Sequence, residues 1–190
     1  MASLPAAIQL AQRAVDNGSF IESVCLSATI IDALLRMGLI LDHQIRTNSS
    51  EILNELLYQP DESAIVSERA IYRRALKQSV ISSQLYARLN GLYQDRNRVV
   101  HQYIISDITT ENVVHFAAKF ADTVHQINSC VRRLEDEQMR MRCGMTTSGV
   151  DIPKALKEDA LNRLNVEIQK KHGNTKLAQI LRGHSKRGAT

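Results

Sequence analysis

The sequence predicts an all-helical protein, and three observations support that prediction. No stretch shows the sustained apolar–polar alternation with β-branched residues that marks a half-buried strand. Apolar residues recur at helical spacing along nearly the whole chain, and only three prolines occur in 190 residues. Hydrophobic residues make up 44% of the chain, which is enough for a core, so we do not expect global disorder.

The first two helices are expected over residues 5–16 and 20–45. Pro5 suits the first turn of a helix, Gly18 suits the turn after one, and Ser19 can cap the next. The second helix has two apolar stripes, so we expect it to be buried on two sides. One stripe comprises Ile21, Val24, Cys25, Ala28, Ile31, Leu35 and Leu39, and the other comprises Ile30, Ala33, Leu34, Met37 and Leu41.

The spacing of apolar residues predicts four further helices, over residues 50–58, 61–75, 82–106 and 111–141. Ser49 or Ser50 is expected to cap the first of them, and Thr109 or Thr110 is expected to cap the last. Together with the two helices before them, they make one expected domain over residues 1–142.

A change in composition follows this domain. Residues 143–150 are small and polar and are expected to form a linker, and residues 151–190 are expected to form a basic helical tail. Residues 1–150 hold fifteen basic and sixteen acidic side chains, whereas the tail holds nine and four. The tail therefore suits contact with RNA or with an acidic partner protein, although a solvated polar face would show the same charges. Its candidate RNA contacts are Lys170, Lys171 and Lys176.

Several kinds of site and location are not expected. The three cysteines include no CxxC pair, which favours a reducing, cytoplasmic compartment and argues against a zinc knuckle. Cys25 is expected to be a small core residue. The longest stretch without Lys, Arg, Asp or Glu has twelve residues, so no membrane-spanning segment is expected. No HExxH, GxxxxGK[ST] or GxGxxG pattern occurs, so no metal or cofactor is expected either.

The side chains that favour chemistry lie within residues 95–103. Asn97 and His101 are four residues apart and share one face of a helix. Arg96 and His101 are five residues apart, which is about 140° around the helix axis. One helix is therefore not expected to aim both at one atom, whereas two copies related by a two-fold axis would surround one groove with both pairs. We accordingly expect a homodimer with a composite site.

These groups suit the cleavage of RNA without a metal ion. Histidine ordinarily titrates near neutrality, so His101 can move a proton to or from the reacting oxygens. Arginine stays charged and forks onto phosphate oxygens, which suits Arg96. Asn97 can orient His101 or the phosphate, Tyr103 can donate a hydrogen bond, and Arg98 adds a positive charge for RNA.

The pattern of Arg96, four residues and His101 resembles the motif of the HEPN superfamily of helical nucleases and RNA-binding proteins. Asn97, directly after the arginine, is typical of its active members. The His-x-Tyr ending, completed by Tyr103, is similar to that of HEPN toxins paired with nucleotidyltransferase antitoxins. The resemblance covers residues 5–142.

This resemblance implies an antiparallel HEPN-like helical bundle with a C-terminal helical extension. It also implies a metal-independent endoribonuclease, acting as a toxin or phage-defence effector, in which Arg96 and His101 are catalytic and Asn97 supports them. Tyr103 would be a candidate modification site, to which a partner antitoxin attaches AMP. Another protein partner through the tail would also fit, and no membrane is expected.

Two other functions are left open by the sequence. One is a non-catalytic HEPN adaptor that binds RNA or protein, and the other is a regulator that binds DNA through a helix-turn-helix in the tail. The arginine–histidine spacing alone is weak, because Arg36 and His43 also satisfy it with six residues between them.

Overall fold

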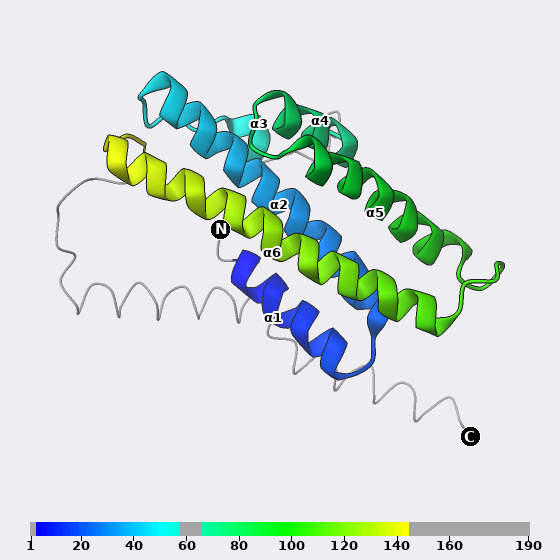
Figure 1. The fold of residues 1–190 in the computed structure, drawn as a ribbon. Helices are drawn as coiled ribbons and strands as arrows, with labels where there is room; N and C mark the ends of the chain where they lie inside the picture. The colour runs from blue at the N-terminus through cyan, green and yellow to red at the C-terminus, as the bar shows by residue number, and fades with distance from the viewer. Residues whose placement is uncertain (1–2, 58–65, 145–190) are drawn as a thin grey trace, which may run out of the picture. The chain divides into compact units, whose positions relative to one another are not determined.

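The computed structural model describes residues 3–57 and 66–144, and every regular element in these two ranges is a helix (Figure 1). This confirms the all-helical prediction. In chain order the helices are α1 (Ser3–Asp16), α2 (Phe20–Thr47), α3 (Asn54–Leu57), α4 (Glu68–Lys77), α5 (Ser83–Gln102) and α6 (Thr110–Met141). Most of the expected linker and all of the basic tail, with Lys170, Lys171 and Lys176, lie outside the described residues.

The long helix α2 forms the centre of the bundle, because its sequence is apolar on two sides. Ile31, Leu35 and Leu39 of its first stripe are buried, and so are Ile30 and Leu34 of its second. Burying one such side chain stabilises a fold by roughly 1.5–3 kcal/mol. Its most extensive contact is with α6, and it also contacts α3, α4 and α5.

A glycine allows a close approach in the middle of α2. A Cβ atom on Gly38 would lie 2.9 Å from Cγ1 of Val80 and 3.6 Å from Cγ2 of Val131 in α6. Interiors are packed almost as densely as organic crystals, so no space is left there for a methyl group. The missing side chain thus sets how closely α2 approaches α6 and the α4–α5 turn.

The directions of the helices differ from the antiparallel arrangement expected from the sequence. α2 and α6 begin at the same end of the bundle, and at the other end Nε2 of Gln138 donates to Oε1 of Gln44 over 2.6 Å (Figure 1). α5 runs opposite to both, as two contacts with α6 show. Nη2 of Arg88, in the first half of α5, lies 2.5 Å from Oδ2 of Asp122 in α6, whereas Tyr103, directly after α5, lies close to the start of α6. The bundle therefore mixes parallel and antiparallel neighbours.

Local side chains decide where several helices begin. Ser67, Ser82 and Thr109 accept hydrogen bonds from the backbone three residues later, and Thr109 forms a capping box with Asn112. Ser67 caps α4, which begins at Glu68 within the helix expected over 61–75, and residues 61–65 lie outside the described residues. Ser19 precedes α2 as expected but makes no side-chain capping bond.

Two predicted ends were wrong by several residues. α5 ends at Gln102 rather than at residue 106, because Tyr103 and Ile108 turn inward and pack with Val99 and Val113. α3 is a single turn rather than a helix that starts near residue 50.

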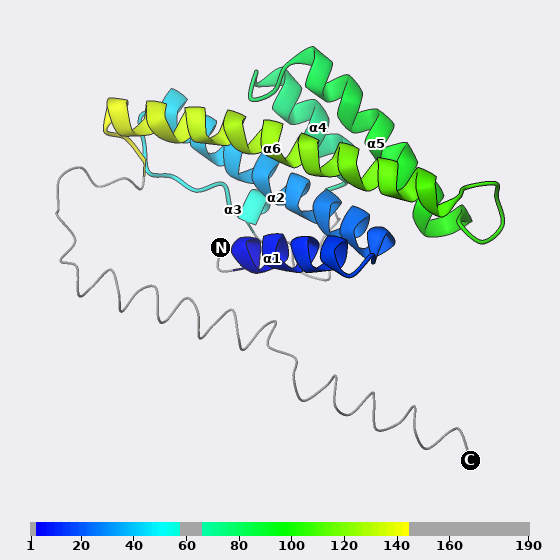
Figure 2. The same ribbon diagram turned by 60° about the horizontal axis from the view of Figure 1, so that its bottom comes forward.

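By length and composition, α2 is also apolar enough to cross a membrane, which the search for charge-free stretches missed. Of its most apolar window, 56% is buried inside the bundle, as in the core helix of a helical protein. α1 lies next to α6 in Figure 1 and next to α2 in Figure 2. A cleft of about 280 Å³ lies between these three helices and is lined by Ile8, Leu34 and Val124, among others.

Candidate active site

Three of the five side chains singled out within residues 95–103 line one pocket between α2 and α5. This pocket, which we call the Arg–His pocket, has a volume of about 300 Å³. α5 contributes four of its lining residues and α2 contributes the other two. The lining residues are Cys25, Thr29, Arg96, Asn97, Val100 and His101.

The angular separation of Arg96 and His101 does not keep them apart within one chain. Their positions differ by about 140° around the helix, yet both border the Arg–His pocket. Side chains of a helix lean toward its N-terminus, so His101 leans back toward the turn that holds Arg96 and Asn97. One helix thus brings both residues to one pocket, the expectation that it does not aim both at a single atom stays a prediction, and each chain supplies only one imidazole to this pocket.

Neighbours on three sides hold the Arg96 guanidinium. Nη1 lies 2.7 Å from Oε1 of Glu68 in α4, and the side chains of this ion pair are 23% and 24% exposed. Nε and Nη2 donate to Oδ1 of Asn97 over 3.3 and 3.0 Å. The guanidinium also lies 5.1 Å from the centre of the Tyr93 ring. These hydrogen bonds occupy three of the five N–H groups of arginine, which leaves two for a ligand.

Glu68 ties the pocket to the core below α4. Its second oxygen, Oε2, accepts a hydrogen bond from the Tyr72 hydroxyl over 3.5 Å. Burial of Tyr72, reinforced by the negative charges of Glu68 and Asp32, raises the pKa of its hydroxyl well above the usual range. Tyr72 therefore stays neutral and keeps donating to the carboxylate that positions Arg96.

Cys25 was expected in the core, but it is only half-buried and lines the Arg–His pocket. Burial raises the pKa of its thiol, and the nearby positive charge of Arg96 offsets part of that rise. Because a thiol must lose its proton to act as a nucleophile, Cys25 is suited to packing against the pocket and not to attack.

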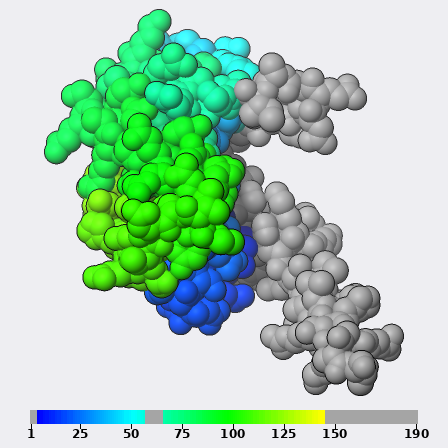
Figure 3. All heavy atoms as spheres, turned by 90° about the vertical axis from the view of Figure 1, so that its right-hand side faces the viewer, coloured from blue at the N-terminus to red at the C-terminus, as the bar shows by residue number. Residues whose placement is uncertain are grey.

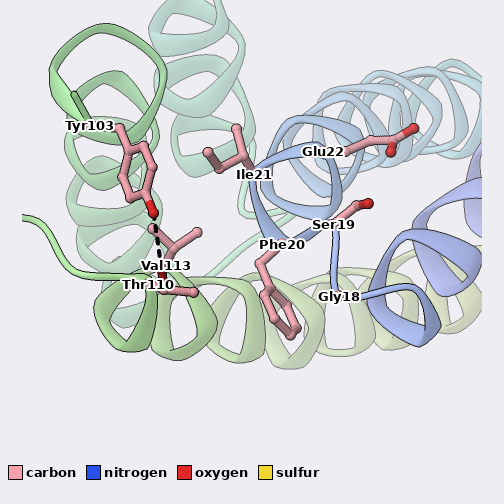
Figure 4. A pocket seen from close by; sticks show the side chains of 8 residues that line it. All are labelled: Gly18, Ser19, Phe20, Ile21, Glu22, Tyr103, Thr110 and Val113. Atoms are coloured by element: carbon pink, nitrogen blue, oxygen red, sulfur yellow. Dashed lines mark hydrogen bonds between the residues drawn. The ribbon is translucent and has the colours of Figure 1, made fainter.

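Tyr103 lies at a second pocket rather than beside Arg96. Its hydroxyl is 2.9 Å from Oγ1 of Thr110. This pocket, which we call the Tyr103 pocket, has a volume of about 470 Å³ and is lined by residues 18–22, Tyr103, Thr110 and Val113 (Figure 4). Arg98 is exposed and lines neither pocket.

The other arginine–histidine pair with suitable spacing does not form a comparable site. Nε of Arg36 is 2.6 Å from Oδ2 of Asp32, one helical turn earlier. Nε2 of His43 is 3.1 Å from Oε2 of Glu51, beyond the end of α2. Each residue is thus engaged by its own acidic neighbour.

Sequence reasoning missed the residues that hold Arg96 in place. Tyr93 comes three residues before Arg96, so helical spacing alone would have placed it beside the guanidinium. Glu68 comes 28 residues before Arg96 and lies on another helix, so no local pattern identifies it.

Chemically, the Arg–His pocket offers a fixed guanidinium with donors to spare, an exposed imidazole and an amide. This set can bind a phosphate and exchange a proton. Among the described residues, no group of three or more His, Cys, Asp or Glu side chains is placed to hold a metal ion. No protein-family model, curated protein or solved structure matches this chain.

Proposed function

We propose that this chain is a metal-independent endoribonuclease of the HEPN type that works as a homodimer. The observation that supports the proposal most is that Arg96, Asn97 and His101 line one pocket. A positive charge for the phosphate and a group that transfers protons near neutrality are the two requirements for cleaving RNA without a metal.

In the proposed reaction, one His101 takes the proton from the 2′-hydroxyl of the RNA. The 2′-oxygen then forms a bond to phosphorus, and the bond from phosphorus to the 5′-oxygen of the next nucleotide breaks. A second His101, protonated at that moment, gives its proton to the departing oxygen. The products are a 2′,3′-cyclic phosphate and a free 5′-hydroxyl. Arg96 stabilises the charge that builds up on the phosphate.

A second copy is proposed because one pocket holds one imidazole, whereas the reaction uses an acid and a base. The turn after α5 offers a docking surface for that copy. Ile104 and Ile105 are 94% and 82% exposed, and this turn projects from the end of the bundle in both ribbon views (Figures 1 and 2). Exposed apolar side chains of this size often mark a protein interface. Val100, which is also exposed, links this surface to the Arg–His pocket.

The setting follows from the resemblance alone. We infer a cytoplasmic toxin or phage-defence effector, and the three free cysteines are consistent with a reducing compartment. In that setting a nucleotidyltransferase partner would attach AMP to the Tyr103 hydroxyl, which borders an open pocket.

The test is cleavage of a single-stranded RNA by the purified full chain in the presence of a chelator. Wild type is compared with His101→Ala and with a matched control, His125→Ala, whose exposed histidine lies on α6 away from the Arg–His pocket. Loss of general acid–base catalysis lowers the rate by about 10²–10⁴-fold in His101→Ala only. Equal rates for wild type and His101→Ala would contradict the proposal.

The dimer is tested separately with the double variant Ile104→Glu, Ile105→Glu. Both positions are exposed, so the bundle should fold, while the charges disrupt an apolar interface. We expect sedimentation to detect monomers and cleavage to be lost together. A fully active monomer would refute the composite site.

A non-catalytic adaptor is the second candidate, and one observation favours it. The pairing of Arg96 with Glu68 and Tyr93 would also suit an arginine whose role is only to join α4 to α5. In that case RNA or protein binding survives in His101→Ala, and wild type cleaves no RNA.

A further inference from the structure

The Tyr103 pocket and the Arg–His pocket are lined by neighbouring stretches of the same two parts of the chain. Residues 18–22, which include the start of α2, line the Tyr103 pocket, and Cys25 and Thr29 of α2 line the Arg–His pocket. Tyr103, directly after α5, lines the Tyr103 pocket, and Arg96 and His101 of α5 line the Arg–His pocket. Ile21 and Cys25 are four residues apart, which is about 6 Å along a helix. A single strand bound with a phosphate at Arg96 would therefore place a neighbouring nucleotide at Tyr103.

The chemistry of the Tyr103 pocket suits a base and not a phosphate. None of its eight lining residues carries a positive charge, and one of them, Glu22, is acidic. In Figure 4 the Glu22 carboxylate points away from Tyr103, while the ring of Tyr103, Thr110 and Val113 gather on one side of the opening and Phe20 and Ile21 on the other. Aromatic and aliphatic walls with a few hydroxyl groups are the usual surroundings of a base splayed out of a single strand.

The pocket is also preformed. The Tyr103 ring packs against a core cluster of Val99, Ile108 and Val113, and its hydroxyl is 2.9 Å from Oγ1 of Thr110. A ring fixed in this way loses little freedom when a base stacks on it. A volume of about 470 Å³ lies within the usual range for small-ligand pockets.

We propose that the Tyr103 pocket binds one nucleobase of a single-stranded RNA, next to the phosphate held at Arg96. The pocket would then decide which base is accepted beside the cleaved bond. This inference rests on the proposed ribonuclease function for its setting, but the binding itself does not require cleavage.

The experiment measures binding of a fluorescent hexanucleotide whose 2′-hydroxyls are all methylated, so that no 2′-oxygen can attack. Tyr103→Leu removes the ring, Tyr103→Phe keeps it, and Tyr86→Leu is a matched control on α5 that borders neither pocket. Stacking of one base is worth enough to weaken binding at least about 5-fold when the ring is lost. We expect this for Tyr103→Leu only, with Tyr103→Phe and Tyr86→Leu close to wild type. Unchanged binding by Tyr103→Leu would overturn the inference.

A second variant, at Ile21, tests the same pocket in case Tyr103→Leu does not fold. Ile21 is 38% exposed at the pocket, so Ile21→Glu leaves the core intact and adds a negative charge beside the base. We expect weaker binding here too. If instead both variants bind RNA normally and shift the monomer–dimer equilibrium, the pocket belongs to the interface with a second copy, and the inference is wrong.

Failure of the inference and failure of the proposed function are distinguishable. If His101→Ala cleaves RNA like wild type while Tyr103→Leu binds weakly, the nuclease proposal fails and the base pocket stands. If His101→Ala is inactive while Tyr103→Leu binds RNA normally, the nuclease proposal stands and the base pocket fails.

Discussion

The two ends of the bundle are built in opposite ways. At the closed end, where α2 and α6 finish, Gln44 and Gln138 are buried, and Gln44 is hydrogen-bonded both to Gln138 and to the backbone of Glu51. At the open end, where α5 finishes, two pockets lie beside exposed isoleucines. In Figure 3, which looks onto the open end, the green atoms of α5, its following turn and the start of α6 cover the centre of the face. The difference is that a buried polar contact closes one end, whereas pockets and exposed apolar side chains mark the other.

The largest expected effect is a loss of RNA cleavage through a change at the open end that leaves the protein folded. Arg96→Lys keeps the charge but loses the fork that binds Asn97 and that we propose to bind phosphate. We expect RNA cleavage to fall by about 10²–10³-fold while the free energy of unfolding changes little. Arg132→Lys, an exposed position on α6, serves as the control. A rate near that of wild type for Arg96→Lys would place the reaction elsewhere.

A change at the closed end should do the opposite. Gln44→Leu is similar in size to the glutamine but leaves the buried amide of Gln138 without its acceptor on α2. Losing a buried hydrogen-bond partner costs about 1–3 kcal/mol. Denaturant unfolding should reveal this loss, and cleavage by the folded protein should match wild type. Lost activity in a stably folded Gln44→Leu protein would show that the two ends are coupled.

A smaller loss of stability is expected between the two ends. Gly38→Ala places a methyl group 2.9 Å from Cγ1 of Val80, so the valine must move aside. Overpacking of this kind costs about 1–3 kcal/mol, and the lower limit is favoured because only one of the three nearest atoms lies closer than van der Waals contact. Gly91→Ala is the control, because a Cβ there meets nothing within 4 Å. Equal unfolding midpoints for the two variants would mean that α2 is free to shift.

The smallest expected effect is the change in stability with pH that comes from Tyr72, which is hydrogen-bonded to Glu68. The raised pKa of Tyr72 means that the folded protein holds this proton more tightly than the unfolded chain. The stabilisation is therefore complete below about pH 10, the ordinary tyrosine pKa, and is lost progressively as the pH rises above it. Phenolate absorbance should detect one tyrosine that ionises late, and Tyr72→Phe should remove that step. If the late step persists in Tyr72→Phe, another tyrosine is responsible.

The sequence predicted the features that depend on neighbouring residues. Thr109 begins α6 as expected, because its hydroxyl accepts a hydrogen bond from the backbone three residues later. The two buried sides of α2 followed from its apolar stripes. Arg96, Asn97 and His101 could be grouped because they lie within six residues of each other.

Features that depend on distant residues could not be predicted. The pairing of Glu68 with Arg96 requires α4 to pack against α5, and the parallel direction of α2 and α6 depends on the path of the whole chain. Tyr103 was grouped with the catalytic residues by sequence, yet the end of α5 at Gln102 turns it into another pocket.

The spacing of contacts along the chain has a consequence for the order of folding. Tyr103 meets Thr110 across seven residues, whereas Gln44 meets Gln138 across 94. Closing the longer loop costs about 2 kcal/mol more conformational entropy, since the cost grows with the logarithm of loop length. We therefore expect the α5–α6 hairpin to form early and the two glutamines to join late. Hydrogen exchange during refolding would detect protection at the start of α6 before it appears at the end of α2.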